Sequence, residues 1–387
     1  MKKKIIRITT VPASLLGLLK GQLKFMSLHY DLIGISSNGG GILKEMESSE
    51  NVKTIPVEMT RKITPFKDLI SVYKLYKIIK IEKPYIVHTH TPKAGTLGMI
   101  AAKLAGVPHR LHTIAGLPLV ESTGAKRSLL NFVEKITYSC ATIIYPNSFG
   151  LRDIILDQKF TTNEKLKVIG NGSSNGIDTN HYNPDLFDEQ HDLSLREELG
   201  IKPHDFVFVF VGRLVTDKGI NELVEAFKKL NLEFKNSKLL LVGPYESYID
   251  PLLPKTLTEI DTHKNIIVAG WQNDVRPFFS ISDALVFPSY REGFPNVVLQ
   301  AGAMELPCIV SNINGCNEII ENNNNGIIIP VKDTQAIYNS MKYMGSIKKD
   351  DLIAMGKKSR KLIISRFEQK FVWQQILKEY NALENLS

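Results

Sequence analysis

The chain has 387 residues, which is too many for one ordinary hydrophobic core, so two domains are expected. Its composition, 43% hydrophobic and 23% charged, is that of a globular protein, and no apolar run approaches the roughly 20 residues that cross a bilayer. The three cysteines are an odd number without metal-ligand spacing. They therefore argue against a disulfide framework and favour a reducing, cytoplasmic compartment.

The net charge is +8, and the positive charge is concentrated in the first half of the chain. Residues 1–30 carry six Lys or Arg and no Asp or Glu, and residues 60–83 carry seven basic residues against two acids. In the second stretch Lys67, Lys74 and Lys77 share one helical face. One such run is most simply a solvated helix face, but two runs beside apolar residues favour contact with an anionic membrane surface. Nucleic acid is not expected as a partner, because the chain has no nucleic-acid-binding motif.

Strand-like runs alternate with helix-like runs along the first half, which predicts a parallel α/β architecture. The charged start of the chain is too short and interrupted for a targeting signal, so it is predicted to be the first buried strand. Helices are expected within 96–105 and 128–140, and the polar, turn-rich segment 171–192 is expected to be a linker. The predicted strands are 4–9, 30–36, 52–57, 85–88, 109–112, 142–146 and 166–169.

The alternation restarts after the linker, so the sequence predicts two Rossmann-like halves. A terminal helical stretch, 349–384, is long enough to return to the first half. The domains are therefore expected to be 1–180 and 190–365, with a helix at 366–387 packing on the first domain. The predicted strands of the second half are 206–211, 238–243, 266–270, 284–288, 307–310 and 326–330.

The run around Glu292 is the most informative one in the chain. A strongly apolar strand, 283–288, leads into it, and a helix is expected to begin near Pro295 and to continue to Glu305. Glu292 and Gly293 thus lie on a turn at the carboxyl end of a strand, beside a helix amino terminus that favours an anion. In an open parallel sheet, ligands bind at that end of the strands. The alternative is an ordinary strand–turn–helix with a surface glutamate.

A second strand-end loop, 212–219, carries Arg213 and Lys218 between two glycines. Two cations beside free backbone N–H groups suit a diphosphate, whereas the alternative is a basic surface loop. The loop lacks the order of a Walker motif. No Gly-x-Gly-x-x-Gly follows the first strand either, which argues against a nicotinamide cofactor.

With these motifs together, the sequence resembles the retaining, nucleotide-sugar-dependent glycosyltransferases with the GT-B fold, family four, over nearly its whole length. Within that family it is similar to the branch that assembles capsule, O-antigen and lipid-linked glycans. The residues that carry the resemblance are Gly212-Arg213-Leu214, Asp217-Lys218-Gly219, Leu241-Val242-Gly243, Ala269-Gly270-Trp271, Pro288-Ser289 and Glu292-Gly293-Phe294-Pro295-Asn296. Those that carry the closer match are Thr9-Thr10-Val11-Pro12, Lys20-Gly21-Gln22, His88-Thr89-His90-Thr91-Pro92-Lys93-Ala94-Gly95 and His112-Thr113-Ile114-Ala115-Gly116-Leu117-Pro118.

The resemblance implies a role for each residue of the second half. Arg213 and Lys218 would hold the donor diphosphate, and Glu292 would lie near the donor sugar. Gln300 stands where the family usually has a second glutamate, so a ribose contact is expected there but a charged role is not. The residues expected to present backbone N–H groups to the donor are Gly293, Phe294, Pro295 and Asn296, and those expected to line the base pocket are Gly243 and Trp271.

In the first half, the resemblance implies that His112, at the end of the strand 109–112, contacts the donor sugar and the reaction centre. The alternative is a strand-end histidine bonded to a backbone carbonyl. His88 and His90 lack further ligands at a zinc-binding spacing, so no metal site is expected. The residues expected on the acceptor side of the cleft are Pro12, Ser14, His90 and Gly116.

The implied reaction moves an N-acetylhexosamine or hexose from a UDP-sugar to a glycan on undecaprenyl diphosphate, with retention at the anomeric carbon. It would need no metal or other cofactor, because Arg213 and Lys218 would neutralise the leaving diphosphate. The acceptor and the basic first half imply a peripheral location at the inner face of the cytoplasmic membrane. Two alternatives remain at this point: a hydrolysing nucleotide-sugar epimerase and a non-catalytic nucleotide-sugar-binding protein.

Overall fold

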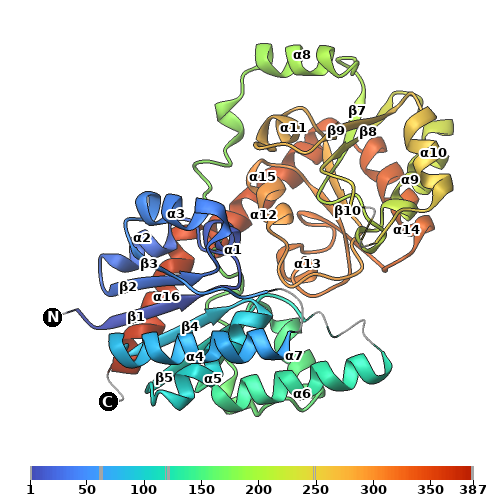
Figure 1. Ribbon diagram of the computed structural model, residues 1–387. Helices are drawn as coiled ribbons and strands as arrows, with labels where there is room; N and C mark the ends of the chain where they lie inside the picture. Colours follow the sequence, from blue (N-terminus) through green and yellow to red (C-terminus); the bar gives the residue numbers. More distant parts are fainter. Residues whose placement is uncertain are drawn as a thin grey trace. The chain divides into compact units, whose positions relative to one another are not determined.

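A computed structural model describes residues 2–60, 64–117, 119, 123–246, 248 and 250–384. Arg61 and Lys62 of the second basic stretch, and Pro118 of the motif that follows His112, lie outside the described residues. The chain divides into two compact units (Figure 1). Unit 1 consists of Met1–Asn175 and Lys370–Ser387, and unit 2 consists of Gly176–Gln369.

Unit 1 is built on one six-stranded parallel sheet with the order β3-β2-β1-β4-β5-β6. The chain winds outward from β1 to β3 and then returns to the centre at β4, so the direction of winding changes between β1 and β4. The strands are β1 (Lys4–Ile8), β2 (Asp31–Ser36), β3 (Lys53–Pro56), β4 (Ile86–His90), β5 (His109–Ile114) and β6 (Ile143–Pro146).

Helices cover both faces of this sheet, and the buried side chains form two clusters. On one face, Ile6 and Val87 pack with Leu75 of α4 and Leu97 of α5. On the other face, Ile5 packs with Leu15 of α1 and Ile376 of α16. The helices are α1 (Pro12–Leu18), α2 (Gln22–Ser27), α3 (Ile42–Glu50), α4 (Pro65–Glu82), α5 (Pro92–Leu104), α6 (Gly124–Cys140), α7 (Phe149–Asp157) and α16 (Gln369–Glu384).

Helix α16 completes the core of unit 1 although it follows unit 2 in the sequence. Arg7, in the middle of β1, is fully buried. Its guanidinium donates to the hydroxyl of Tyr380 on α16 and to the side-chain oxygen of Gln22, and it lies 3.4 Å from Nδ1 of His88. Burial lowers the pKa of Arg7, because the charged form loses its hydration. Tyr380 and Gln22 therefore solvate a buried cation.

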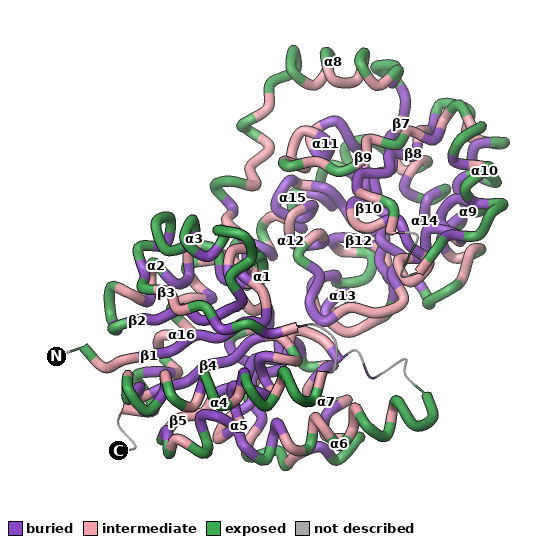
Figure 2. The backbone as a smooth tube through the Cα atoms, in the orientation of Figure 1, coloured by how far each residue is buried: buried purple, intermediate pink, exposed green. Residues whose placement is uncertain are grey.

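Unit 2 repeats the architecture, with the strand order β12-β11-β10-β7-β8-β9 and a change of winding between β7 and β10. Its inner strands are buried, whereas β9 and β12 at the two edges are partly exposed (Figure 2). They are β7 (Phe206–Val211), β8 (Ser237–Val242), β9 (Ile266–Gly270), β10 (Ala284–Phe287), β11 (Cys308–Ser311) and β12 (Gly326–Ile329). The helices are α8 (Glu189–Glu198), α9 (Ile220–Glu233), α10 (Pro254–Thr262), α11 (Arg276–Ser280), α12 (Asn296–Ala303), α13 (Cys316–Ile319), α14 (Thr334–Ser346) and α15 (Lys349–Phe367). The predicted fold class, two parallel α/β halves, is confirmed.

Four details of the sequence prediction are wrong. Residues 166–169 form no strand: Leu166 makes one isolated bridge to Ile144, and the chain then turns at Gly170. The strand predicted to end at 112 continues to 114. The segment 171–192 is not all linker, because α8 begins at Glu189. The terminal stretch is two helices, since Glu368 is extended and pairs with Ile177 in an isolated bridge.

Candidate active site

In unit 2 the loops that follow β7 and β10 start side by side, because these strands are neighbours with Phe208 in register with Ala284. The first loop passes through a single 3-10 turn, Thr216–Lys218, and enters α9 at Gly219. Gly219 has φ +71°, and a Cβ there would overlap the carbonyl oxygen of Pro288 in the second loop. The winding changes between β7 and β10, so the two loops meet where ligands bind in open α/β sheets.

Lys218 and Glu292, predicted from separate motifs, are in direct contact. The Nζ of Lys218 donates to Oε1 of Glu292, and the hydroxyl of Ser289 donates to the same oxygen at 3.1 Å. Only 13% of the Lys218 side chain and 18% of the Glu292 side chain are exposed. The pair is therefore shielded from water, and its geometry is fixed from both loops.

Arg213 lies on the same edge and has a different carboxylate partner. Its NH1 donates to Oε2 of Glu246 at 2.8 Å, and 40% of its side chain is exposed. Burial lowers the pKa of Arg213, but the hydrogen bond and charge of Glu246 and the charge of Asp217 outweigh burial, so the pKa is raised overall. Arg213 is cationic and partly accessible, as a phosphate ligand must be.

The amino end of α12 has no side-chain cap, and its N-cap residue is Pro295. The N–H groups of its first turn therefore form the positive end of an eight-residue helix directly after Glu292 and Gly293. Asn314 holds this turn in place, because its Nδ2 donates to the carbonyl oxygens of Glu292 and of Gly293, the latter at 3.2 Å. The side chain of Phe294 is buried and lies 5.3 Å from the ring of Phe367, which anchors the turn on α15.

Gln300 lies on the second turn of α12, and its Nε2 donates to the hydroxyl of Tyr182 at 2.8 Å. Burial raises the pKa of Tyr182 to about 12, so the phenol stays protonated. Gly243 follows β8 with φ +145°, where a Cβ would overlap the carbonyl oxygen of Gly212. Trp271 follows β9, and 65% of it is exposed. An aromatic face is thus accessible near the edge strand, as stacking on a nucleotide base requires.

Four residues of this edge have roles that sequence patterns did not indicate: Tyr182, Glu246, Ser289 and Asn314. Ser289 belongs to the motif Pro288-Ser289, but that motif predicts no function for its side chain. The others act through contacts with residues 21 to 118 positions away. The chain offers no local signal for such contacts.

The residues predicted in unit 1 lie in different environments. Pro12 starts α1, and its buried ring packs against Gly39. Ser14 lies in the first turn of α1 and Gly116 lies beyond β5, both partly exposed. His90 is the last residue of β4 and is 4% exposed. The loops after β1 and β4 are joined by the hydroxyls of Thr10 and Thr91, 2.8 Å apart.

His112 lies inside β5, and 3% of it is exposed. Its Nδ1 is 2.8 Å from the hydroxyl oxygen and 3.3 Å from the carbonyl oxygen of Thr89. Because a carbonyl only accepts, Nδ1 carries the proton and Nε2 is the open acceptor. Burial lowers the pKa of His112 to about 4, so the ring is neutral at physiological pH. Its contact with a donor sugar remains a prediction.

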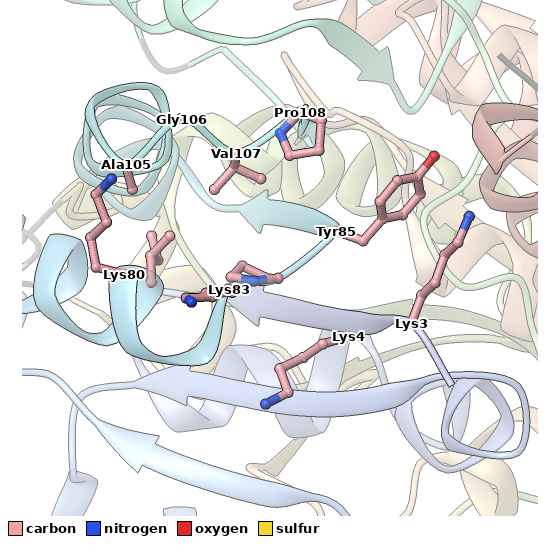
Figure 3. Close-up of a pocket in the computed structure, with 11 residues that line it drawn as sticks. Lys3, Lys4, Lys80, Lys83, Tyr85, Ala105, Gly106, Val107 and Pro108 are labelled. Atoms are coloured by element: carbon pink, nitrogen blue, oxygen red, sulfur yellow. The ribbon is translucent and has the colours of Figure 1, made fainter. Parts of the chain in front are cut away.

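A pocket of about 550 Å³ lies at the amino-terminal edge of the unit 1 sheet, opposite the edge that carries His90 and His112 (Figure 3). Lysines line it, but they do not converge on a common point. Lys4 donates to Glu82 at 2.6 Å, and Lys3 lies over the ring of Tyr85 at 4.1 Å. The carboxyl ends of α4 and α5 also border the pocket, and helix carboxyl ends repel anions. The strand-end loops of unit 2 remain the better candidate for an anionic donor.

Comparisons with known proteins agree with this geometry. Residues 192–362 match the family Glycosyl transferases group 1, and residues 18–148 match Glycosyl transferase 4-like. The capsular polysaccharide biosynthesis glycosyltransferase CapM of Staphylococcus aureus is 33% identical over 386 residues, 98% of this chain and 97% of that protein. The UDP-Gal:α-D-GlcNAc-diphosphoundecaprenol α-1,3-galactosyltransferase of Escherichia coli is 34% identical over 316 residues, 81% of this chain and 79% of that protein.

Solved structures of similar fold include HepE of Anabaena in complex with UDP and glucose. It has a TM-score of 0.80 to this chain at 17% identity, and the match covers 98% of this chain and 100% of that one. The chain belongs to the group 1 glycosyltransferases and is a glycosyltransferase with the GT-B fold.

Proposed function

We propose that this glycosyltransferase moves a hexose or N-acetylhexosamine from a UDP-sugar to a saccharide on undecaprenyl diphosphate, with retention at the anomeric carbon, during synthesis of a surface polysaccharide. The observation that carries the proposal is the shielded Lys218–Glu292 pair beside the uncapped amino end of α12. The names of the relatives support the substrates: one acts in capsule synthesis, and one transfers from UDP-Gal to α-D-GlcNAc-diphosphoundecaprenol.

In this proposal the two cations bind the donor diphosphate. The Lys218 ammonium has three N–H groups, so it can keep Glu292 and donate to a phosphate oxygen as well. Arg213 would exchange Glu246 for phosphate, with which a guanidinium forms a bidentate pair. Glu292, oriented by Lys218 and Ser289, would accept from a hydroxyl of the donor sugar.

The reaction would then need no metal ion or other cofactor. The glycosidic bond to phosphate breaks, the sugar passes through an oxocarbenium-like state, and the acceptor hydroxyl attacks from the same face and gives its proton to the departing phosphate. Negative charge develops on the diphosphate, where Arg213, Lys218 and the α12 N–H groups would stabilise it.

The test combines donor binding and turnover. UDP is titrated by calorimetry, and UDP-sugars are then assayed by mass spectrometry with α-D-GlcNAc diphosphate on a short prenyl chain. Binding of UDP together with a product of one added sugar is expected. UDP binding without turnover on any donor would contradict the proposed donor and acceptor classes, and turnover abolished by a chelator would contradict the metal-free route.

For the lipid-linked acceptor we propose that α4 contacts an anionic membrane surface. Among the described helices, none is both long and apolar enough to span a bilayer. The first half of α4 nevertheless exposes a stripe of large apolar side chains, and lysines flank it, as in interfacial helices. The exposed fractions are Phe66 85%, Leu69 68%, Ile70 56% and Tyr73 56%, and the flanking residues are Lys67, Lys74 and Lys77.

Sedimentation with vesicles tests this contact. Binding to vesicles that contain phosphatidylglycerol should fall at least about tenfold in the double variant Phe66→Ser, Leu69→Ser, since each buried side chain of this size contributes about 1.5–3 kcal/mol. Leu232→Ser, which removes a 70% exposed leucine from α9, is the matched control. Equal binding of both variants would remove α4 from the proposal.

A further inference from the structure

Unit 1 contains a small polar cavity at the carboxyl edge of β4, β5 and β6. Three side chains in register across these strands line one side of it: His90, Thr113 and Tyr145. Residues 173 and 174 and Ile376 of α16 border it as well. The volume is about 10 Å³, which is room for one water-sized group.

Four buried polar atoms at this cavity have no hydrogen-bond partner within the described part of the chain. They are Nε2 of His90, the hydroxyl of Tyr145, Oδ1 of Asn147 and Oγ of Ser174. His90, Tyr145 and Asn147 are 4%, 2% and 6% exposed. A buried polar atom without a partner costs about 1–3 kcal/mol, so four around one cavity indicate a group that joins them.

The neighbouring histidine shows that this is not a loosely packed region. His88 precedes His90 by two residues on the same face of β4, and the two rings stack with centroids 4.3 Å apart. Both ring nitrogens of His88 are paired: Nδ1 lies 2.6 Å from the hydroxyl of Tyr380, and Nε2 lies 2.7 Å from that of Thr113. Within the lining, hydrogen bonds are thus complete at His88 and Thr113, and the unpaired atoms are confined to the four residues named above.

The chemistry of the wall defines the missing group. The described residues that line the cavity include no Asp, Glu, Lys or Arg, and burial lowers the pKa of its two histidines, His88 and His90, so both rings are neutral. Arg7 contacts His88 rather than the cavity itself, and its guanidinium is hydrogen-bonded to Tyr380 and Gln22. Oδ1 of Asn147 only accepts, whereas the hydroxyls of Tyr145 and Ser174 can donate. The group must therefore be neutral and small and must both donate and accept, which describes an O–H and excludes a phosphate.

We propose that this cavity binds one hydroxyl group of the acceptor saccharide. The cavity opens at the carboxyl edge of a doubly wound sheet, where ligands bind, and Ser174 at its rim is partly exposed. The hydroxyl donates to Asn147 and accepts from Tyr145 or Ser174. The inference rests on the proposed function, because it assumes a saccharide acceptor in unit 1.

The test removes one hydroxyl from the protein and one from the ligand. Tyr145→Phe deletes an unpaired O–H without changing the packing, and Tyr138→Phe deletes the O–H of a fully buried tyrosine beside Glu134, in the other core cluster of unit 1. Affinities are measured by calorimetry for α-D-GlcNAc diphosphate on a short prenyl chain, for analogues that each lack one sugar hydroxyl, and for methyl glycosides. UDP affinity is measured in parallel.

Tyr145→Phe should lower the affinity for the lipid-linked saccharide about fivefold, the effect of one neutral hydrogen bond, and should leave the affinity for UDP unchanged. One deoxy analogue should bind the wild type about fivefold more weakly than its parent but bind Tyr145→Phe as well as its parent does, which is the coupling expected of a direct contact. Ser174→Ala should resemble Tyr145→Phe, and Tyr138→Phe should resemble the wild type.

Two results would overturn the inference. If Tyr145→Phe and Ser174→Ala bind every analogue like the wild type, the cavity holds an ordered water only. If the wild type binds UDP but binds neither the prenyl-linked saccharide nor the methyl glycosides, unit 1 takes no saccharide hydroxyl. Failure to bind UDP would instead count against the proposed function, so the two failures are distinguishable.

Discussion

Lys218 is paired with Glu292 and Arg213 with Glu246, so both cations of the candidate site carry counter-ions before any donor arrives. The two pairs differ in exposure. The Lys218 side chain is 13% exposed and the Arg213 side chain 40% exposed. In the proposed function, an incoming diphosphate would displace Glu246 from Arg213 through solvent, whereas it would have to join Glu292 at Lys218.

Arg213→Ala and Lys218→Ala should each lower kcat/KM about 100-fold or more while the protein stays folded. Each variant removes a positive charge that would stabilise the leaving diphosphate. Transfer rates and circular dichroism measure the two effects. Lys228→Ala removes a lysine that also has a 2.6 Å carboxylate partner, Glu259, on an exposed face of α9, and should keep normal rates. Near-normal rates in both site variants would refute the diphosphate assignment.

Gln300 should bind donor through the side-chain oxygen that Tyr182 leaves open. Tyr182→Phe removes the partner of Nε2 and should weaken UDP about threefold to tenfold, as Gln300→Ala should. Gln300→Glu should retain more affinity, because the protonated Tyr182 can donate to a carboxylate. Calorimetry with UDP measures all three. Unchanged affinity in Tyr182→Phe and Gln300→Ala would exclude residue 300 from the donor site.

At this scale the sequence indicates which residues face a strand end but not how they pair. Arg213, Lys218 and Glu292 could be singled out because each follows an apolar strand by a few residues. Glu246 and Asn314 could not, since their partners lie 33 and 21 or more positions away. His112 was placed at a strand end that is two residues too early, because Thr113 and Ile114 continue the pattern of β5.

Among the elements, the loops after β7 and β10 depend on the lack of a side chain at Gly219. Gly219→Ala combines an unfavourable φ with a clash against the Pro288 carbonyl, and it should cost about 3 kcal/mol or more of stability together with activity. Gly200→Ala has a similar φ, +66°, but nothing within 4 Å of the new Cβ, and should cost about 1 kcal/mol. Urea unfolding compares them, and equal losses would show that the contact between the loops is not tight.

Most strands could be predicted because parallel strands covered on both faces are continuous apolar runs. Two failures have physical causes. Residues 166–169 are apolar at three of four positions, which resembles a strand, but the glycine that follows turns the chain away from β6 after one bridge. The break between α15 and α16 coincides with the pairing of Glu368 with Ile177. The helical periodicity of the sequence cannot predict a contact with a residue so distant in the chain.

On the scale of the whole molecule, three buried histidines of unit 1 make it sensitive to acid. His88, His90 and His112 are buried, and burial lowers the pKa of each, that of His112 to about 4. Their pKa in the unfolded chain is about 6.5. Below that pH the unfolded chain binds protons that the folded chain does not, so stability should fall as the pH drops below about 6.5, and for His112 the fall continues to about pH 4.

Urea unfolding at pH 7.5, 6 and 5 measures this loss. His112→Asn keeps a donor for the Thr89 carbonyl but cannot titrate, so it should lose less stability than the wild type over the same range. Identical losses would mean that His112 titrates normally in the folded protein.

The overall architecture and the glycosyltransferase family were predictable from the sequence, because they rest on strand spacing and on motifs that lie in both halves of the chain. Family membership also decides against a hydrolysing epimerase and a non-catalytic binding protein, the alternatives that the sequence left open. The polar cavity was not predictable, since it depends on residues from five segments that only the folded unit brings together.

The position of α16 also bears on how the protein is made. Unit 2 holds all of its own strands and helices, whereas the sheet of unit 1 lacks the cover over Ile5 and the partner of Arg7 until α16 is available. A ribosome produces α16 after every residue of unit 2. Domains usually complete folding in the order of synthesis. Here the earlier-made unit must wait, with Arg7 lacking the second of its two partners and an apolar face uncovered, while the later-made unit can finish first.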